Sequence, residues 1–210
     1  MRLVLMALLG LGLVTPDFAV DPWGAFKGTV RAEWRDDGRT MRLLEPFAYE
    51  DPDGTPWLAP ADSVIDGASI PRSLWSLIGG PYEGRYRNAS VVHDVACKER
   101  RRPWRAVHRM FYRACRAGGL DSTDAKVMYG AVYLFGPRWP QPGAAAAKAT
   151  AATYAPPLTS TDDFLRMREW IETHPELALE QIEALDHAAL VKAMPEPPPA
   201  RVGLLHPESP

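Results

Sequence analysis

The chain has 210 residues, of which 46% are hydrophobic and 24% are charged, and its formal net charge at pH 7 is −2. This composition is typical of a globular protein with a buried core, and it excludes the strong positive charge typical of nucleic-acid-binding proteins. The 21 prolines are the outlier, at about twice the usual share of roughly 5%. They gather in loops and after Pro137, which predicts a folded unit shorter than the whole chain.

Residues 1–20 form a signal-like segment. Arg2 precedes an apolar run that is too short to span the hydrocarbon layer of a membrane. This pattern predicts an exported protein, periplasmic or secreted. Asp17 stands where a cleavage site after Ala19 would need a small residue, so cleavage stays open. A buried N-terminal strand or helix, or a misassigned start codon, is the alternative interpretation.

A core α+β domain is predicted for residues 26–139, beginning with a small antiparallel β-sheet. Hydrophobic and polar residues alternate between positions 26 and 49, as they do in a half-buried strand. Asp-Asp-Gly at 36–38 and Asp-Pro-Asp-Gly at 51–54 supply the turns of two hairpins.

A cluster of three to four helices follows the sheet in the predicted domain. Pro and Gly residues delimit these helices, because Pro is tolerated in a first turn and Gly often ends a helix. The expected helices are 71–78, 87–100, 103–117 and 122–135, with Ser122 as the N-terminal cap of the last one.

The remainder of the chain is predicted to be appended to this domain. Residues 140–158 are rich in Ala and Pro, which is typical of a linker. Helical periodicity returns in 159–193, where we expect accessory helices. Residues 194–210 are predicted to be a disordered tail.

The candidate site lies on the two helices that flank the turn at residues 101–103. Such a short connection makes the helices antiparallel neighbours, so residues at equal distances from the turn face each other. At about 1.5 Å per residue, Cys97 comes level with His108 and His93 with Tyr112. His93 and Cys97 also share one helix face, because they are four residues apart. We therefore expect these side chains around one patch, with Asp94 at its edge.

The two cysteines, Cys97 and Cys115, would be expected to form a disulfide in an oxidising compartment. In the hairpin arrangement, Cys115 lies about 10 Å further along the helix axis than Cys97. A disulfide requires Cα atoms within about 7 Å. We therefore expect two free thiols, with Cys115 as a small core residue.

Three functional interpretations of the patch stay open beside a structural one. His93, Cys97 and His108, with Asp94 or water as the fourth ligand, suit zinc. Alternatively, a histidine activates Cys97 as a nucleophile. In the third interpretation, His93 is a base that deprotonates water while Asp94 holds a cation such as calcium. In the structural interpretation, the polar side chains of the hairpin only form hydrogen bonds to the loops before it.

A glycine-rich loop precedes the hairpin and is the candidate binding loop. Glycine lets the backbone approach a ligand closely. Asp66 and Arg72 are expected to pair across this loop. The candidate binding residues are Asp66, Gly67, Ser69, Arg72, Gly79 and Gly80.

Several motifs carry a resemblance to a known family. DGASIPRSLWSLIGGP, RYRNASVVHD, RPWRAVHRMFYRA and AKVMYGAVYLFGPRW occur in that order. They resemble the bacterial and phage family known as domain of unknown function 1353, over roughly residues 30–139. The resemblance implies no settled activity, and it suggests association with a cell envelope or a phage particle.

A weaker similarity, of motif only, is to secreted calcium-dependent phospholipases of the A-two type. In that comparison His93 matches the base and Asp94 the calcium carboxylate. Cys97 stands where the family has Tyr, and His108 stands where it has a supporting Asp. A second histidine cannot stabilise an imidazolium as a carboxylate does, so the comparison does not carry phospholipase chemistry to this chain.

The leading prediction is an exported domain with a metal-assisted, hydrolase-like site centred on His93 and Asp94, in which zinc or calcium is the candidate cofactor. The alternative is a non-catalytic structural or binding module of the cell envelope or of phage origin. The substrate and whether the domain is an enzyme stay open, and we expect no nucleic acid partner.

Overall fold

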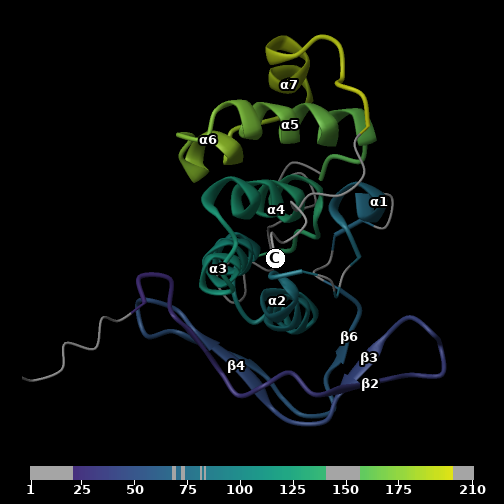
Figure 1. Ribbon diagram of the computed structural model, residues 1–210, viewed down its shortest axis with the longest axis vertical. Coiled ribbons are helices and arrows are strands. Elements are labelled where there is room, and N and C mark those ends of the chain that lie inside the picture. Colours follow the sequence, from purple (N-terminus) through teal and green to yellow (C-terminus); the bar gives the residue numbers. More distant parts are fainter. Residues whose placement is uncertain are drawn as a thin grey trace, which may run out of the picture.

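The computed structural model describes residues 21–67, 70–71, 74–80, 82, 84–140 and 157–200. The signal-like segment at 1–20 lies outside the described residues, as do most of the predicted linker and the end of the predicted tail. The arrangement is α+β, as the sequence predicts, with strands at one end and helices stacked above them (Figure 1). No helix within the described parts of the chain is long and apolar enough to cross a membrane.

The strands form two small antiparallel sheets. One sheet has the order β1–β4–β5, and its strands are Ala25–Lys27, Phe47–Glu50 and Pro56–Ala59. The other has the order β2–β3–β6, and its strands are Ala32–Trp34, Met41–Leu43 and Val64–Ile65. The predicted hairpins are therefore present as β2–β3 and β4–β5, while β1 and β6 each add an outer strand through a longer connection.

Alternation along the strands directs one face of the first sheet toward the helices. Tyr49 pairs with Trp57 across β4 and β5, and both side chains are buried. Leu58, the next residue along β5, points to the opposite face and is 64% exposed. The period of two that predicts the sheet thus also determines which residues enter the core.

The helices follow in the expected order. The first four are α1 (Trp75–Ile78), α2 (Arg87–Glu99), α3 (Trp104–Ala117) and α4 (Ser122–Phe135). The α1 helix begins later than the predicted 71–78. Asp121, rather than Ser122, caps α4, because its side chain accepts hydrogen bonds from the N–H groups of Thr123 and Asp124.

Helix α4 is the centre of the helical layer. Its side chains are buried almost all round, as expected for a helix with neighbours on several sides. Below it lie α3 and α2, and above it lie α5 (Thr161–Thr173), α6 (Leu179–Glu183) and α7 (His187–Ala193) (Figure 1). Helices are thus present in the predicted accessory region, and α5 packs directly on α4.

Candidate metal centre

The α2–α3 hairpin brings His93, Cys97 and His108 together in its interior. The chain reverses at Arg100, which adopts the left-handed conformation with φ 53°, and α3 begins four residues later. The His93 Nε2 atom lies 2.9 Å from His108 Nδ1, and Cys97 Sγ lies 3.6 Å from His93 Nε2. One potential ligand atom of each residue lies within 4.8 Å of the other two. The convergence predicted from the spacing is therefore present.

The hydrogen bonds fix where the protons of the two histidines lie. His108 Nε2 is 3.1 Å from the Pro137 carbonyl oxygen, which can only accept a hydrogen bond. Burial lowers the pKa of His108 from 6.5 to about 3, so its ring is neutral and carries its one proton on Nε2. His108 Nδ1 is consequently an acceptor, and His93 Nε2–H donates to it.

Aromatic side chains surround the cluster and separate it from bulk solvent. His93 and His108 have no exposed surface, and Cys97 is 5% exposed. Phe111 lies 4.6 Å from the His93 ring, and Trp104 lies 5.5 Å from the His108 ring, measured between centroids. In such surroundings, polar groups must be satisfied by one another or by a bound ion.

Helix periodicity explains which α3 residues face His93. Phe111, three residues after His108, lies on the same helix face and packs against the His93 ring. Tyr112, which we expected in the patch, contacts Trp23 and Tyr129 instead. The Pro137 carbonyl was not predicted, because a backbone oxygen beyond α4 leaves no signal in the residue pattern.

The donor set suits a borderline-soft metal ion. Zinc binds imidazole nitrogen at about 2.0–2.1 Å and thiolate sulfur at about 2.3 Å, which places tetrahedral N and S ligands roughly 3.5 Å apart and two N ligands roughly 3.3 Å apart. The observed Cys97–His93 distance of 3.6 Å fits the first separation, whereas the His93–His108 distance of 2.9 Å is shorter than the second. A metal ion would therefore replace the hydrogen bond between the histidines and move their rings slightly apart.

The sulfur atom of Cys97 lies close to both nitrogens of the His93 ring. It lies 3.6 Å from Nε2 and 3.8 Å from Nδ1 of the same ring. Nearly equal distances to both nitrogens place the sulfur away from the lone-pair direction of either one. The arrangement is therefore poorly suited to the proton transfer from Cys97 to His93 that a Cys–His catalytic pair requires.

Asp94 points away from this cluster and toward the preceding loop. Its Oδ2 atom accepts hydrogen bonds from the N–H groups of Asp66, at 2.8 Å, and Gly67, at 2.5 Å. Burial, reinforced by the nearby Asp66 carboxylate, raises the pKa of Asp94 to about 6. Calcium requires oxygen ligands, so a carboxylate oxygen occupied by two N–H donors does not favour a calcium site here.

The candidate binding loop is anchored to α2 by several of its predicted residues. The Asp66 side chain lies 3.1 Å from Lys98 Nζ and 3.3 Å from Arg39 Nη2. Gly67 has φ 97°, a conformation that favours glycine. Ser69 and Arg72 lie outside the described residues, and so does the predicted pairing of Asp66 with Arg72.

Gly79 and Gly80, the last two residues of the candidate binding loop, follow α1. Gly79 ends the helix with φ 102°, and the Gly80 carbonyl accepts a hydrogen bond from the Tyr86 hydroxyl at the start of α2. These glycines therefore connect α1 to α2 and do not enter the metal-ligand cluster.

The two cysteines are both free. Cys115 is fully buried on α3, and burial raises the pKa of its thiol well above the usual value. The structure thus agrees with the expectation that Cys115 is a core residue and that Cys97 belongs to the candidate site.

Comparisons with known proteins found relatives of this chain. Two curated relatives come from Sinorhizobium fredii (strain NBRC 101917 / NGR234). Uncharacterized protein y4jT is 40% identical over 134 residues, which are 63% of this chain and 40% of that protein. Uncharacterized protein y4iH is 43% identical over 103 residues, which are 49% of this chain and 43% of that protein.

The chain therefore spans about two fifths of the length of these relatives. No solved structure matches it. The motif similarity to phospholipases is not shown by any of the comparisons. Residues 41–132, which include both helices of the hairpin, match the family described as protein of unknown function (DUF1353), and the resemblance predicted from the motifs is confirmed.

Proposed function

We propose that this domain binds a zinc ion through His93, Cys97 and His108 and that the metal forms the centre of a hydrolase-like site. The observation that carries the proposal is the convergence of three ligand atoms within 4.8 Å in the interior of the hairpin. Two imidazoles and one thiolate form a set that occurs in catalytic zinc sites, where three protein ligands leave the fourth position for water. Bound zinc would make that water acidic enough to act as a nucleophile near neutral pH.

The surroundings of His108 support this assignment. Metal-ligating histidines usually donate their second ring N–H to a carbonyl or carboxylate, which orients the ring. His108 already has this arrangement, because Nε2 faces the Pro137 carbonyl and leaves Nδ1 as the lone-pair donor. The low pKa of His108 means that no proton has to leave this ring before a metal binds.

The roles within the predicted His93–Asp94 pair differ in this proposal. His93 is a ligand rather than the base. Asp94 holds the backbone of Asp66 and Gly67 beside α2 and is a positioning residue.

Cobalt substitution tests the proposal. Adding Co²⁺ to metal-free protein should produce a thiolate-to-cobalt charge-transfer band and the visible bands of a tetrahedral site. Cys97→Ser should remove the charge-transfer band, and Cys115→Ser is the matched control, because Cys115 lies on the same hairpin outside the cluster. A spectrum of octahedral cobalt, or a charge-transfer band that survives Cys97→Ser, would refute the assignment.

A second candidate is a non-catalytic structural or binding module. It is favoured by the burial of all three side chains and by the hydrogen-bond chain from His93 through His108 to Pro137, which joins α2, α3 and the segment after α4. In that case His93→Gln should lower the thermal midpoint by several degrees, and added zinc should not change the midpoint of the wild type. Under the zinc proposal, zinc added to metal-free protein raises the wild-type midpoint and has no effect on the variant.

A further inference from the structure

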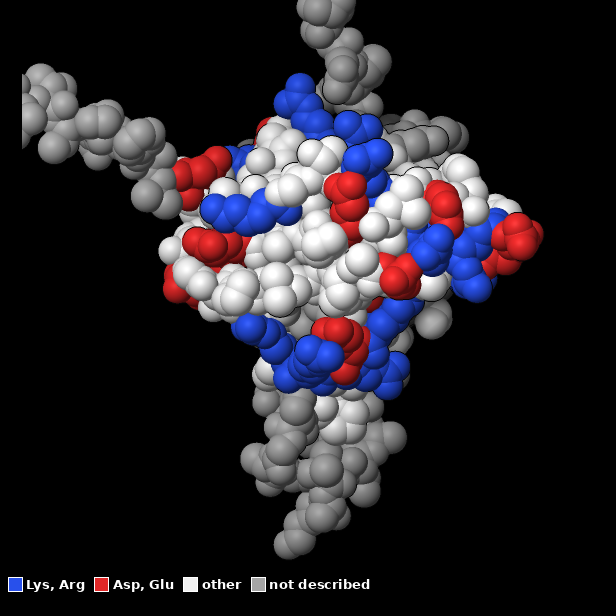
Figure 2. Space-filling model, turned by 90° about the horizontal axis from the view of Figure 1, so that it is seen from below, with Lys and Arg blue, Asp and Glu red and all other residues white. Residues whose placement is uncertain are grey.

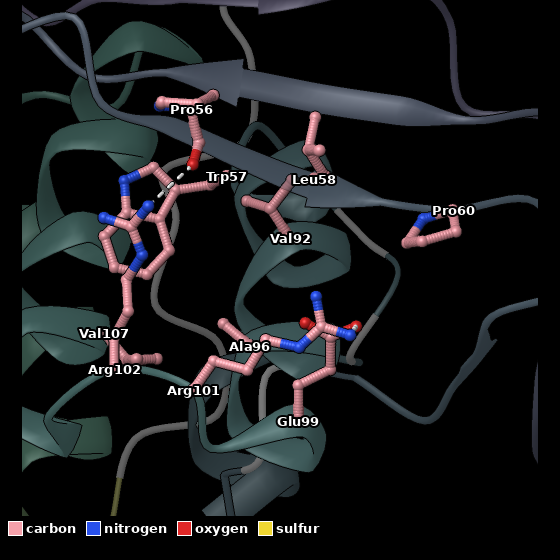
Figure 3. A pocket seen from close by; sticks show the side chains of 10 residues that line it. All are labelled: Pro56, Trp57, Leu58, Pro60, Val92, Ala96, Glu99, Arg101, Arg102 and Val107. Atoms are coloured by element: carbon pink, nitrogen blue, oxygen red, sulfur yellow. Dashed lines mark hydrogen bonds and ion pairs between the residues drawn. The ribbon is translucent and has the colours of Figure 1, made fainter. Parts of the chain in front are cut away.

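A pocket lies beside α2, on a different face of the helix from the candidate metal centre. Its volume is about 240 Å³, and it opens between β5, α2 and the turn that joins α2 to α3 (Figure 3). Leu58, Val92, Ala96 and Val107 supply apolar walls. None of the three candidate metal ligands lines it, so the pocket is a separate site.

The mouth of the pocket carries one cation in a fixed position. The Arg102 guanidinium stacks on Trp57, 4.5 Å from the ring centroid, and donates a hydrogen bond of 3.3 Å to the Pro56 carbonyl. Figure 3 shows this side chain at one side of the pocket, over the indole ring of Trp57. Stacking on an aromatic face pre-organises a guanidinium and leaves donors for an anion.

A second cation at the mouth is held only loosely. Arg101 pairs with Glu99 at 3.3 Å, and its side chain is 79% exposed. Exposed ion pairs of this kind contribute little free energy, so Arg101 can exchange Glu99 for another anion at small cost. Two guanidinium groups and one carboxylate leave a net charge of about +1 at the mouth, which complements a monoanion.

The apolar lining of the pocket continues onto the exposed surface of the sheet at Leu58. Figure 2 shows the sheet side of the molecule, where Lys and Arg side chains gather at one end beside a broad uncharged area. Leu58, on β5, is 64% exposed at the edge of the pocket. A ligand that covered this side chain would gain hydrophobic free energy in proportion to the apolar area removed from water.

We infer that this pocket binds a small amphipathic carboxylate, with its hydrocarbon part between β5 and α2 and its carboxylate at Arg101 and Arg102. The volume lies below the roughly 300–1,000 Å³ typical of pockets for drug-sized ligands, which restricts the hydrocarbon part to a short chain or a single ring. This inference does not depend on metal binding. The pocket and the metal centre occupy different faces of one helix.

Calorimetric titration with octanoate, octanol and octylamine tests the inference, because these probes share a chain length and differ in the charge of the head group. Octanoate should bind more tightly than octanol by about threefold or more, and octylamine should bind least. Equal binding of the three probes, or no binding of octanoate, would overturn the inference.

Variants locate the site. Arg101→Gln should weaken octanoate binding by about three- to tenfold, and Glu99→Gln should strengthen it, because the arginine loses its competing carboxylate. Ala96→Leu should abolish binding by filling the pocket, and Leu58→Ser, at a side chain that is 64% exposed, should weaken it by removing apolar contact. Arg35→Gln, in the turn after β2 and outside the pocket lining, is the matched charge control and should leave the affinity unchanged. If Arg101→Gln and Arg35→Gln have the same effect, octanoate binds elsewhere and the inference is wrong.

Discussion

Replacement of Asp94 by asparagine isolates the electrostatic cost of one buried carboxylate. Asp94 has no exposed surface, and its Oδ2 atom accepts the N–H groups of Asp66 and Gly67. An asparagine oxygen in the same position can accept both hydrogen bonds without carrying a charge. The substitution therefore keeps the contact to the loop and removes the charge that burial penalises.

The size and sign of the effect follow from the raised pKa of Asp94. The folded protein holds this proton up to about pH 6, whereas the unfolded chain releases it near 3.8. Between these values the folded state binds more protons, so the contribution of Asp94 to stability falls as the pH rises. The difference corresponds to roughly 3 kcal/mol above pH 6. Asp94→Asn should match the wild type near pH 4 and gain roughly 3 kcal/mol on it by pH 7.5.

Thermal unfolding of both proteins across this pH range measures the effect. The wild-type curve alone is not sufficient, because the lowered pKa of His108 acts in the opposite direction and makes stability rise with pH. Subtracting the wild-type midpoint from that of Asp94→Asn cancels this contribution. For a chain of this size, roughly 3 kcal/mol corresponds to about 6–12 °C.

Asp94→Ala supplies the contrast that separates charge from hydrogen bonding. It leaves two N–H groups of the loop without their acceptor, and it should therefore be less stable than Asp94→Asn by about 2–5 kcal/mol at every pH, because neither variant carries the charge. If the difference between Asp94→Asn and the wild type does not change with pH, the carboxylate is not penalised by burial and the reasoning is wrong.

Three further predictions concern the packing around the hairpin. Gly118→Ala would place a methyl group 2.5 Å from the Arg85 carbonyl oxygen. The urea midpoint of unfolding should fall by an amount equivalent to about 1–3 kcal/mol. An unchanged midpoint would contradict this contact. Glu183, at the end of α6, accepts hydrogen bonds from the Tyr129 hydroxyl at 2.6 Å and from Arg109 Nε at 2.7 Å. Glu183→Gln should therefore speed proteolytic cleavage near α6. An unchanged cleavage rate would show that these bonds do not hold the helix in place. In a Cys97→Ala variant, Cys115 should resist thiol reagents at pH 8 until urea unfolds the protein, because burial disfavours its thiolate. Rapid labelling of the native protein would refute that explanation.

Local patterns explain how much of the fold could be predicted from the sequence. The Arg101–Pro103 turn made α2 and α3 antiparallel neighbours, and counting from it brought His93, Cys97 and His108 together correctly. The division of the strands into two sheets could not be predicted. It depends on β1 pairing with β4 and on β6 pairing with β3, across connections that carry no pattern of their own.

The roles of individual site residues were harder to predict, because they depend on side-chain direction. His93 and Asp94 are adjacent on α2, so a helix directs them about 100° apart, one toward α3 and the other toward the loop. Phe111 took the place expected for Tyr112 because the two helices meet along a face that includes positions 108 and 111. The Pro137 carbonyl orients His108 from outside the motif altogether.

The metal content of protein purified without added metal tests the central claim most directly. Elemental analysis of the wild type should find about one zinc ion per chain, as should analysis of Cys115→Ser. His93→Gln and Cys97→Ser should each lose most of it. Folded wild-type protein that contains no zinc, and that takes up none when zinc is supplied, would contradict the proposed metal centre.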